Sequence, residues 1–120
     1  MKVRAIRGAT TVESDTKAAI EGAVVELIKA LLEKNELIEE DLISILFTAT
    51  PDLTSEFPAT AARRAGLSDT PLICAQELDI NGALPKTIRV MVHAYSKRSK
   101  SEIEHIYLNG AVVLRKDLNR

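Results

Sequence analysis

Residues 72–92 of this 120-residue sequence place ionisable side chains inside segments that otherwise have the composition of a protein core. Towards the end of this stretch, hydrophobic residues alternate with others, which predicts a β-strand. The apolar face of that strand carries Ile88, Val90 and Val92, so Arg89 lies on the opposite face. A guanidinium in mid-strand is costly to bury unless it meets an anion, a carboxylate or water. The strand therefore either holds a solvated surface arginine or forms the wall of a site.

The first half of the chain predicts a strand, a long helix and a second strand. Residues 2–12 alternate as a strand does, although neither face is cleanly apolar. Hydrophobic residues then recur at helical spacing from the N-cap candidates Asp15 and Thr16 to a stop at Asn35. Residues 42–50 are almost continuously apolar and rich in β-forming residues, which indicates a central strand covered on both faces.

The second half of the chain predicts short elements. They are a helix over 58–65, a strand over 71–74, the strand of Arg89, and two strands over 103–108 and 111–114. Gly66 ends the helix in the left-handed conformation. Asn109-Gly110 is a strong signal for a two-residue hairpin between the last two strands. Residues 116–120 lack periodicity and predict a flexible tail.

These elements predict a single α+β domain over residues 1–120. We expect a mixed sheet of five or six strands with one long and one short helix on one face. The other face of the sheet carries alanine, valine and some arginine, and it needs a cover. Identical subunits can supply this cover, with arginine side chains lining the clefts between them.

Composition excludes several classes of function. Aromatic residues make up 3% of the sequence, the net charge is −1 and the pI is near 6.1, so we expect no binding to nucleic acid. The N-terminus MKVRAIRGATT has no apolar run long enough for a signal peptide or a membrane span, and the single cysteine allows no intrachain disulfide, which predicts a cytoplasmic protein. The one cysteine and two histidines lack metal-binding spacing, so we expect no metal and no cofactor.

Four segments carry most of the unusual residues: IRGATTVE near the N-terminus, TATPDLTSEFPATAAR in the middle, then CAQELDINGALPKTIRVMV, and HIYLNGAVVLRKDL near the end. In this order and spacing they resemble the monofunctional chorismate mutases of the trimeric α/β-barrel class, over residues 2–118. The resemblance implies the rearrangement of chorismate to prephenate in phenylalanine and tyrosine biosynthesis. It also implies a homotrimer whose three sheets form a central pseudo-barrel, with active sites at the subunit interfaces.

The resemblance implies catalytic roles for Arg7, Glu77 and Arg89. Arg7 falls where the family pairs a cation with a substrate carboxylate, and Arg89 falls where the family contacts the breaking ether oxygen. Glu77, with Cys74, falls where the family binds the ring hydroxyl. The further substrate contacts that the resemblance implies are Phe57, Arg63, Ile73, Cys74, Ala75, Gln76, Tyr107, Leu114 and Arg115. Thr60 stands where the family often has a lysine, which leaves one cation fewer at the entrance.

The chemistry that these residues offer is consistent with such a reaction. An intramolecular rearrangement needs a compact substrate conformer and electrostatic stabilisation of the transition state, and it needs no nucleophile. Arginines at mid-strand positions suit a dicarboxylate whose ether oxygen gains negative charge as its bond breaks.

The residues alone leave other interpretations open. Arg7 can mark an exposed strand end, and Arg63 can be a surface charge on an alanine-rich helix. Cys74 can be a nucleophile, but that role needs a nearby base, and the sequence gives no argument that His93 or His105 is close. The competing functions are a trimeric module that binds a carboxylate metabolite without chemistry and a hydrolytic imine deaminase.

Overall fold

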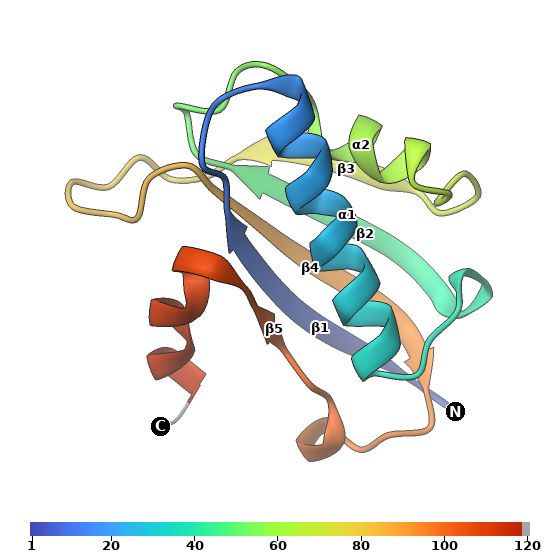
Figure 1. Cartoon of the computed structure of the whole chain (residues 1–120). Coiled ribbons are helices and arrows are strands. Elements are labelled where there is room, and N and C mark those ends of the chain that lie inside the picture. The colour runs from blue at the N-terminus through green and yellow to red at the C-terminus, as the bar shows by residue number, and fades with distance from the viewer. Residues whose placement is uncertain (119–120) are drawn as a thin grey trace.

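The structure, a computed structural model, describes residues 1–118 and is built on one five-stranded mixed sheet (Figure 1). Its strands are β1 (Lys2–Thr11), β2 (Leu42–Ala49), β3 (Leu72–Gln76), β4 (Thr87–Ser96) and β5 (Ile106–Tyr107). Their order across the sheet is β3-β2-β4-β1-β5. The central strand β4 is antiparallel to β1 and β2, while β3 runs parallel to β2 and β5 parallel to β1. This confirms the predicted mixed sheet.

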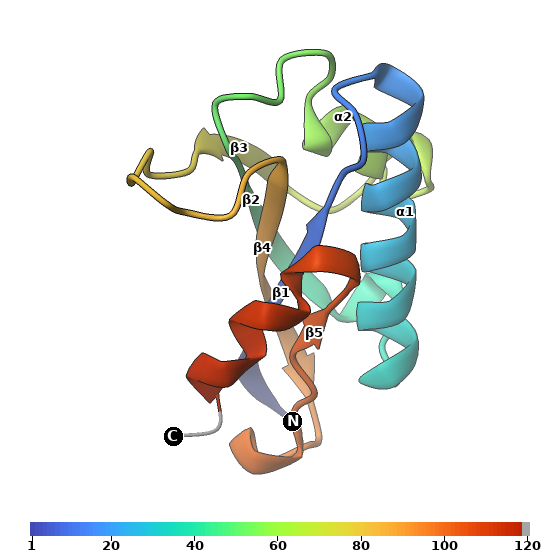
Figure 2. The ribbon, with the colours of Figure 1, turned by 60° about the vertical axis from the view of Figure 1, so that its left-hand side comes forward.

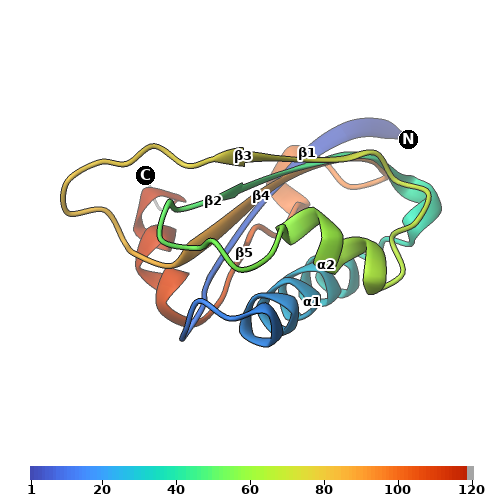
Figure 3. The ribbon, with the colours of Figure 1, turned by 90° about the horizontal axis from the view of Figure 1, so that it is seen from above.

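Two helices, α1 (Lys17–Lys34) and α2 (Pro58–Arg64), cover the same face of the sheet, as the view from above shows (Figure 3). The Thr16 hydroxyl accepts a hydrogen bond from the backbone N–H of Ala19 at 3.1 Å and so caps the start of α1. Asn35 caps the end of α1, and Gly66 follows α2 with a φ of +115°. The local signals in the sequence therefore placed both helices correctly.

The hydrophobic core lies between α1 and the sheet. Ile20, Val24 and Leu27 of α1 are fully buried against Ile6 of β1 and Phe47 of β2. Close approach of the two layers depends on Gly8. A Cβ at that position would lie 2.8 Å from Cγ1 of Val90 and 3.2 Å from Cδ1 of Leu27.

Among residues 1–118, no helix lies across the opposite face of the sheet. We call it the open face. Four of its large apolar side chains are exposed: Val3 by 51%, Leu46 by 40%, Ile73 by 65% and Tyr95 by 49%. The prediction of a central strand over 42–50 that is covered on both faces is therefore wrong for the single chain. An apolar run indicates that both faces are buried, but it does not say whether the same chain supplies the cover.

The C-terminal segment also differs from its prediction. Residues 111–114 do not form a strand, because Asn109–Leu118 fold into a 3₁₀ helix, η3. Figure 2 shows η3 beside the β5 edge of the sheet, extending away from α1. Residues 116–118, predicted as part of a flexible tail, belong to η3, and positions 119 and 120 lie outside the described residues. Two shorter 3₁₀ helices are η1 (Glu39–Asp41) and η2 (Lys100–Glu102).

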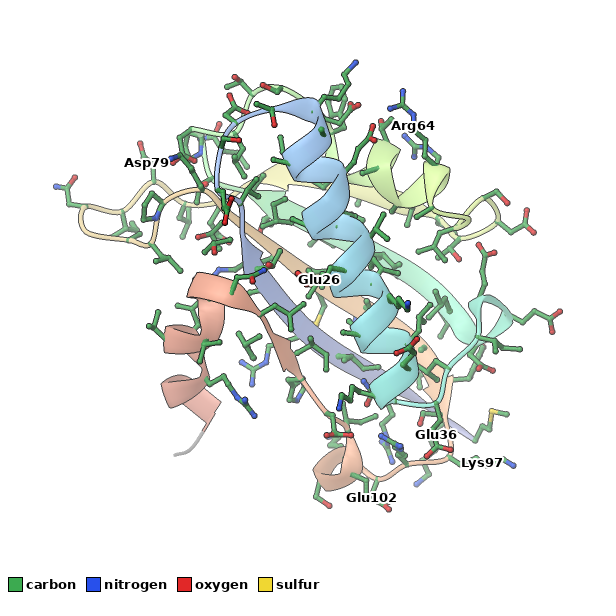
Figure 4. All side chains as sticks on the ribbon, viewed as in Figure 1. Glu26, Glu36, Arg64, Asp79, Lys97 and Glu102 are labelled. Atoms are coloured by element: carbon green, nitrogen blue, oxygen red, sulfur yellow. The ribbon has the colours of Figure 1, made fainter. Side chains whose placement is uncertain are left out.

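The contacts of Asn109 and Gly110 explain why no hairpin forms. The Asn109 side-chain amide donates hydrogen bonds at 3.0 Å to the Thr10 hydroxyl and to Glu26, which Figure 4 labels on α1. The Gly110 backbone N–H donates to Thr11 Oγ1 at 2.9 Å, and a Cβ at Gly110 would lie 2.9 Å from the same atom. The Asn-Gly pair thus attaches the chain to β1 and α1 and does not form the turn of a β-hairpin.

Candidate active site

The open face brings together Arg7, Glu77, Arg89 and Tyr107, which lie far apart in the sequence. They line a concavity of about 190 Å³, together with Thr48 of β2. Strand register explains the grouping, because Ala9 of β1 lies between Arg89 on β4 and Tyr107 on β5, while Thr48 lies opposite Arg89. We call this cluster, Arg7, Thr48, Glu77, Arg89 and Tyr107, the sheet-face site.

Glu77 and Arg89 form an ion pair at the centre of the sheet-face site. Glu77 Oε2 lies 3.2 Å from Arg89 Nε, and the two side chains are 26% and 46% exposed. Oε2 also accepts a hydrogen bond from the Thr48 hydroxyl at 2.8 Å, and Oε1 accepts one from the Leu78 backbone N–H at 3.2 Å. Arg89 is therefore paired with a fixed carboxylate on a half-open surface and is not simply a solvated surface arginine.

Arg7 lies on the same face, next to the half-buried ring of His105. Its backbone N–H donates to His105 Nδ1 at 2.9 Å. Burial lowers the pKa of His105 below its ordinary value of 6.5, and the Arg7 guanidinium lowers it further. Both effects favour the neutral imidazole, whose Nδ1 can accept this hydrogen bond. Within the described residues, the Arg7 guanidinium itself has no ion-pair or hydrogen-bond partner, so it can meet an anion.

A second concavity of about 480 Å³, which we call the loop cleft, lies beside the segment that joins β2 to α2. The predicted site residues that line it are Phe57, Cys74, Ala75 and Gln76. Cys74 Sγ accepts a hydrogen bond from the Ala59 backbone N–H at 3.3 Å, so the thiol is directed towards α2. The structure thus separates Cys74 from Glu77 within one chain.

The rim of the loop cleft is held by Asp15, at the start of α1. Its carboxylate accepts hydrogen bonds from the Thr54 hydroxyl at 2.8 Å and from the backbone N–H groups of Thr54 and Ser55 at 2.9 and 3.0 Å. These bonds, that of the Thr54 hydroxyl first, lower the pKa of Asp15 below its ordinary 3.8. Asp15 was an N-cap candidate, but the helix cap is Thr16, and Asp15 fixes the loop instead.

The remaining predicted site residues line neither concavity. Arg63 is exposed on α2, and Ile73 is exposed on the open face. On η3, Leu114 is half-buried and Arg115 is exposed. Arg64, the neighbour of Arg63, is labelled beside α2 in Figure 4 and forms ion pairs with Glu21 of α1 and with Glu56.

Sequence reasoning did not identify Thr48, which contacts Glu77. The signal was a polar residue at the end of the apolar run of β2, on the same face as Leu46. Within residues 1–118, no group of three or more His, Cys, Asp or Glu side chains is placed to hold a metal ion. None of the helices in this part of the chain is long and apolar enough to cross a membrane.

Comparison with known proteins gives a consistent result. The sequence model of the family "Chorismate mutase type I" matches residues 3–118. Chorismate mutase AroH of Bacillus subtilis (strain 168) is 43% identical over 120 residues, covering 99% of this chain and 94% of that protein. Chorismate mutase AroH of Thermus thermophilus is 46% identical over 117 residues, covering 97% and 96%. The solved structure of a chorismate mutase from Clostridium thermocellum matches with a TM-score of 0.90 and 50% identity, covering 92% of this chain and 98% of that one.

Proposed function

The chain belongs to the chorismate mutase type I family and isomerises chorismate to prephenate, and we propose that it does so at the sheet-face site. One observation carries this assignment. Two arginines, a carboxylate and a phenol, from four separate parts of the chain, meet in one concavity of the open face. This set fits a substrate with two carboxylates, a ring hydroxyl and an ether oxygen.

In this proposal Arg89 stabilises the transition state. As the ether bond breaks, negative charge grows on its oxygen, and a guanidinium that is already in place needs no reorganisation to meet that charge. Two full unit charges about 4 Å apart, at an effective dielectric near 20, interact by about 4 kcal/mol, or roughly three decades of rate. A partial charge gains less than this, but exclusion of water from a closed cleft strengthens the interaction.

The other residues of the sheet-face site restrict the substrate to a reactive conformer. In this proposal Arg7 and Tyr107 bind the carboxylates and Glu77 accepts a hydrogen bond from the ring hydroxyl, which is supported by their lining the same concavity. Holding the two reacting ends of one molecule together removes part of the entropic barrier of the rearrangement. The negative charge of Glu77 also offsets part of the field of Arg89, with which it is paired.

We also propose that the active unit is a homotrimer with its sites between subunits. The exposed apolar side chains of the open face support this proposal, because such a surface needs a cover. Within one chain the predicted contacts that line a concavity form two separate groups, one in the sheet-face site and one in the loop cleft. We propose that the loop cleft of one subunit faces the sheet-face site of the next, and that the three sheets line a central pseudo-barrel. The assembly should then sediment at about three times 13.1 kDa.

Two broader predictions belong to the same proposal. Residues 1–120 act as one domain, which is supported by a family match over residues 3–118. The protein acts in the cytoplasm, as the sequence predicts, and cell fractionation tests this location. Family membership does not favour the metabolite-binding module or the imine deaminase.

Turnover measurements on three proteins test the assignment. The unaltered chain should consume chorismate without any added metal or cofactor, and prephenate should appear in equal amount. In Arg89→Ala, kcat should fall by roughly three decades with a much smaller change in KM. Arg89→Lys should recover part of the rate, because lysine keeps the positive charge. The recovery should be incomplete, because lysine lacks the planar guanidinium with its several N–H donors. If Arg89→Ala raises KM and leaves kcat within a few-fold, Arg89 is a binding residue only.

A further inference from the structure

Thr48 occupies a position between the two charged groups at the centre of the sheet-face site. On β2 it lies opposite Arg89 of β4 on one side and Ala75 of β3 on the other. Glu77 comes just after β3 and continues the pairing with β2, since its backbone N–H donates to the Ala49 carbonyl at 2.9 Å. Strand register alone thus brings the Thr48 hydroxyl next to both ionic side chains.

The contacts of the Glu77 carboxylate show how it is oriented. Oε2 accepts a hydrogen bond from Thr48 Oγ1 at 2.8 Å and lies 3.2 Å from Arg89 Nε. Oε1 accepts from the Leu78 backbone N–H at 3.2 Å. Each oxygen therefore has a neutral donor, and the closest contact of the carboxylate with the guanidinium is through Oε2.

A glutamate next to an arginine commonly pairs with it through two parallel contacts, one to each carboxylate oxygen. That arrangement occupies a terminal nitrogen of the guanidinium as well as Nε. Here the closest contact of the pair is made by Nε, at 3.2 Å, and within the described residues the terminal nitrogens of Arg89 donate no hydrogen bond. They line the concavity that also holds Arg7 and Tyr107.

We propose that Thr48 is a positioning residue that keeps the Glu77 carboxylate from binding the terminal nitrogens of the Arg89 guanidinium. Its hydroxyl holds Oε2 on the Nε side, and the Leu78 N–H holds Oε1 away from the guanidinium. The terminal N–H groups of Arg89 then stay free for the ether oxygen of the substrate. This inference rests on the proposed role of Arg89 and adds the group that keeps Arg89 available.

Thr48→Val is the direct test, because valine has nearly the shape of threonine and lacks the hydroxyl. We expect kcat to fall by roughly tenfold or more with a much smaller change in KM, since hydrogen bonds to charged groups are the stronger ones. Thr48→Ser keeps the hydroxyl and should return kcat to within a few-fold of the unaltered enzyme. If Thr48→Val does not fold, Thr48→Ala makes the same comparison.

A double-mutant cycle separates positioning from a general structural effect. In a Glu77→Gln background there is no carboxylate charge that could bind the terminal nitrogens of Arg89. Thr48→Val should therefore lower kcat only slightly further in that background. Thr70→Val is the matched control, because the Thr70 hydroxyl also donates to a carboxylate, that of Glu39 at 3.1 Å, away from the sheet-face site. This control should leave kcat and KM unchanged.

Three results would overturn the proposal: an unchanged kcat in Thr48→Val, a Thr48→Ser variant as slow as Thr48→Val, or equal losses in both Glu77 backgrounds. These results are distinguishable from a failure of the proposed function. If Arg89→Ala keeps its kcat, the role of Arg89 is wrong. If Arg89→Ala loses rate as expected while Thr48→Val does not, only the inference about Thr48 fails.

Discussion

The two faces of β4 differ in both exposure and charge. On the covered face, Ile88, Val90 and Val92 are at most 4% exposed, and they pack in the core with α1. On the open face, one residue away in the sequence, Arg89 is half exposed and paired with Glu77. The pleat of a single strand thus separates side chains that stabilise the fold from a side chain of the proposed active site. Substitutions at adjacent positions should therefore change different quantities.

The largest effects should come from comparing Phe47→Ala with Arg89→Ala. Phe47 is fully buried on the covered face, so its truncation should lower the free energy of unfolding by about 3–5 kcal/mol. Arg89→Ala should lower it by about 1 kcal/mol or less, because a partly exposed ion pair contributes little, while kcat falls by roughly three decades. Urea denaturation and steady-state kinetics measure the two quantities. A destabilisation by Arg89→Ala as large as that by Phe47→Ala would remove the distinction between the faces.

A charge on the open face should break the assembly. Leu46 lies in register with Ile73 and Met91, within the surface that we expect neighbouring subunits to cover. Leu46→Asp should yield a folded, inactive monomer, because an unpaired carboxylate is too costly to bury at an interface. Val25→Asp is the matched control, since Val25 is exposed to a similar degree on α1, and it should remain trimeric and active. Sedimentation equilibrium decides between these outcomes, and a trimeric, active Leu46→Asp would show that the open face is not the interface.

Glu77→Gln should have a smaller effect than removal of Arg89. The amide keeps the shape of the side chain and loses its charge, so we expect kcat to fall by roughly ten- to a hundredfold. Because Glu77 is proposed to transfer no proton, the pH profile of the variant should gain no new bell shape. An unaltered enzyme whose rate follows the titration of Glu77 near neutral pH would argue for general acid–base catalysis instead.

The smallest effect concerns stability in mild acid. The pKa of His105 is lowered below its ordinary 6.5 by burial first and by Arg7 second, so below pH 6.5 the unfolded chain binds a proton that the folded chain resists. The contribution of neutral His105 to the free energy of unfolding is complete above pH 6.5. It is lost as the pH falls from 6.5 towards the lowered pKa of His105 in the folded chain. His105→Gln should flatten that slope, measured by thermal unfolding at several pH values. His93→Gln, which removes an exposed histidine, is the control, and an equal effect of both would contradict the assignment.

Much of the covered face could be predicted from the sequence, because its signals are local. Helical spacing between Thr16 and Asn35 defined α1, and alternation around Arg89 separated the two faces of β4. The Asn109-Gly110 signal was misleading, because it fits both a tight turn and a close approach to β1, and only the tertiary contacts decide between them.

The open face was less predictable, since its contacts join distant parts of the chain. The family resemblance indicated Arg7, Glu77, Arg89 and Tyr107, and strand register places them together. The continuous apolar run of residues 42–50 gave Thr48 no direction, and only the position of Glu77 beyond β3 gives its hydroxyl a partner. Likewise, no local pattern could show that Cys74 turns towards α2 while Glu77 turns towards the open face.

The most direct test of the account is complementation between two inactive chains. One carries Arg89→Ala in the sheet-face site, and the other carries Phe57→Asp with Arg63→Glu beside the loop cleft. After the two are mixed, denatured and refolded in equal amounts, we predict about a quarter of the activity of the unaltered trimer, since each site needs an intact group from each of two chains drawn at random. If the mixture stays as inactive as its components while trimers form, both groups act within one chain, and the proposed pairing of the open face with a neighbour's loop cleft is wrong.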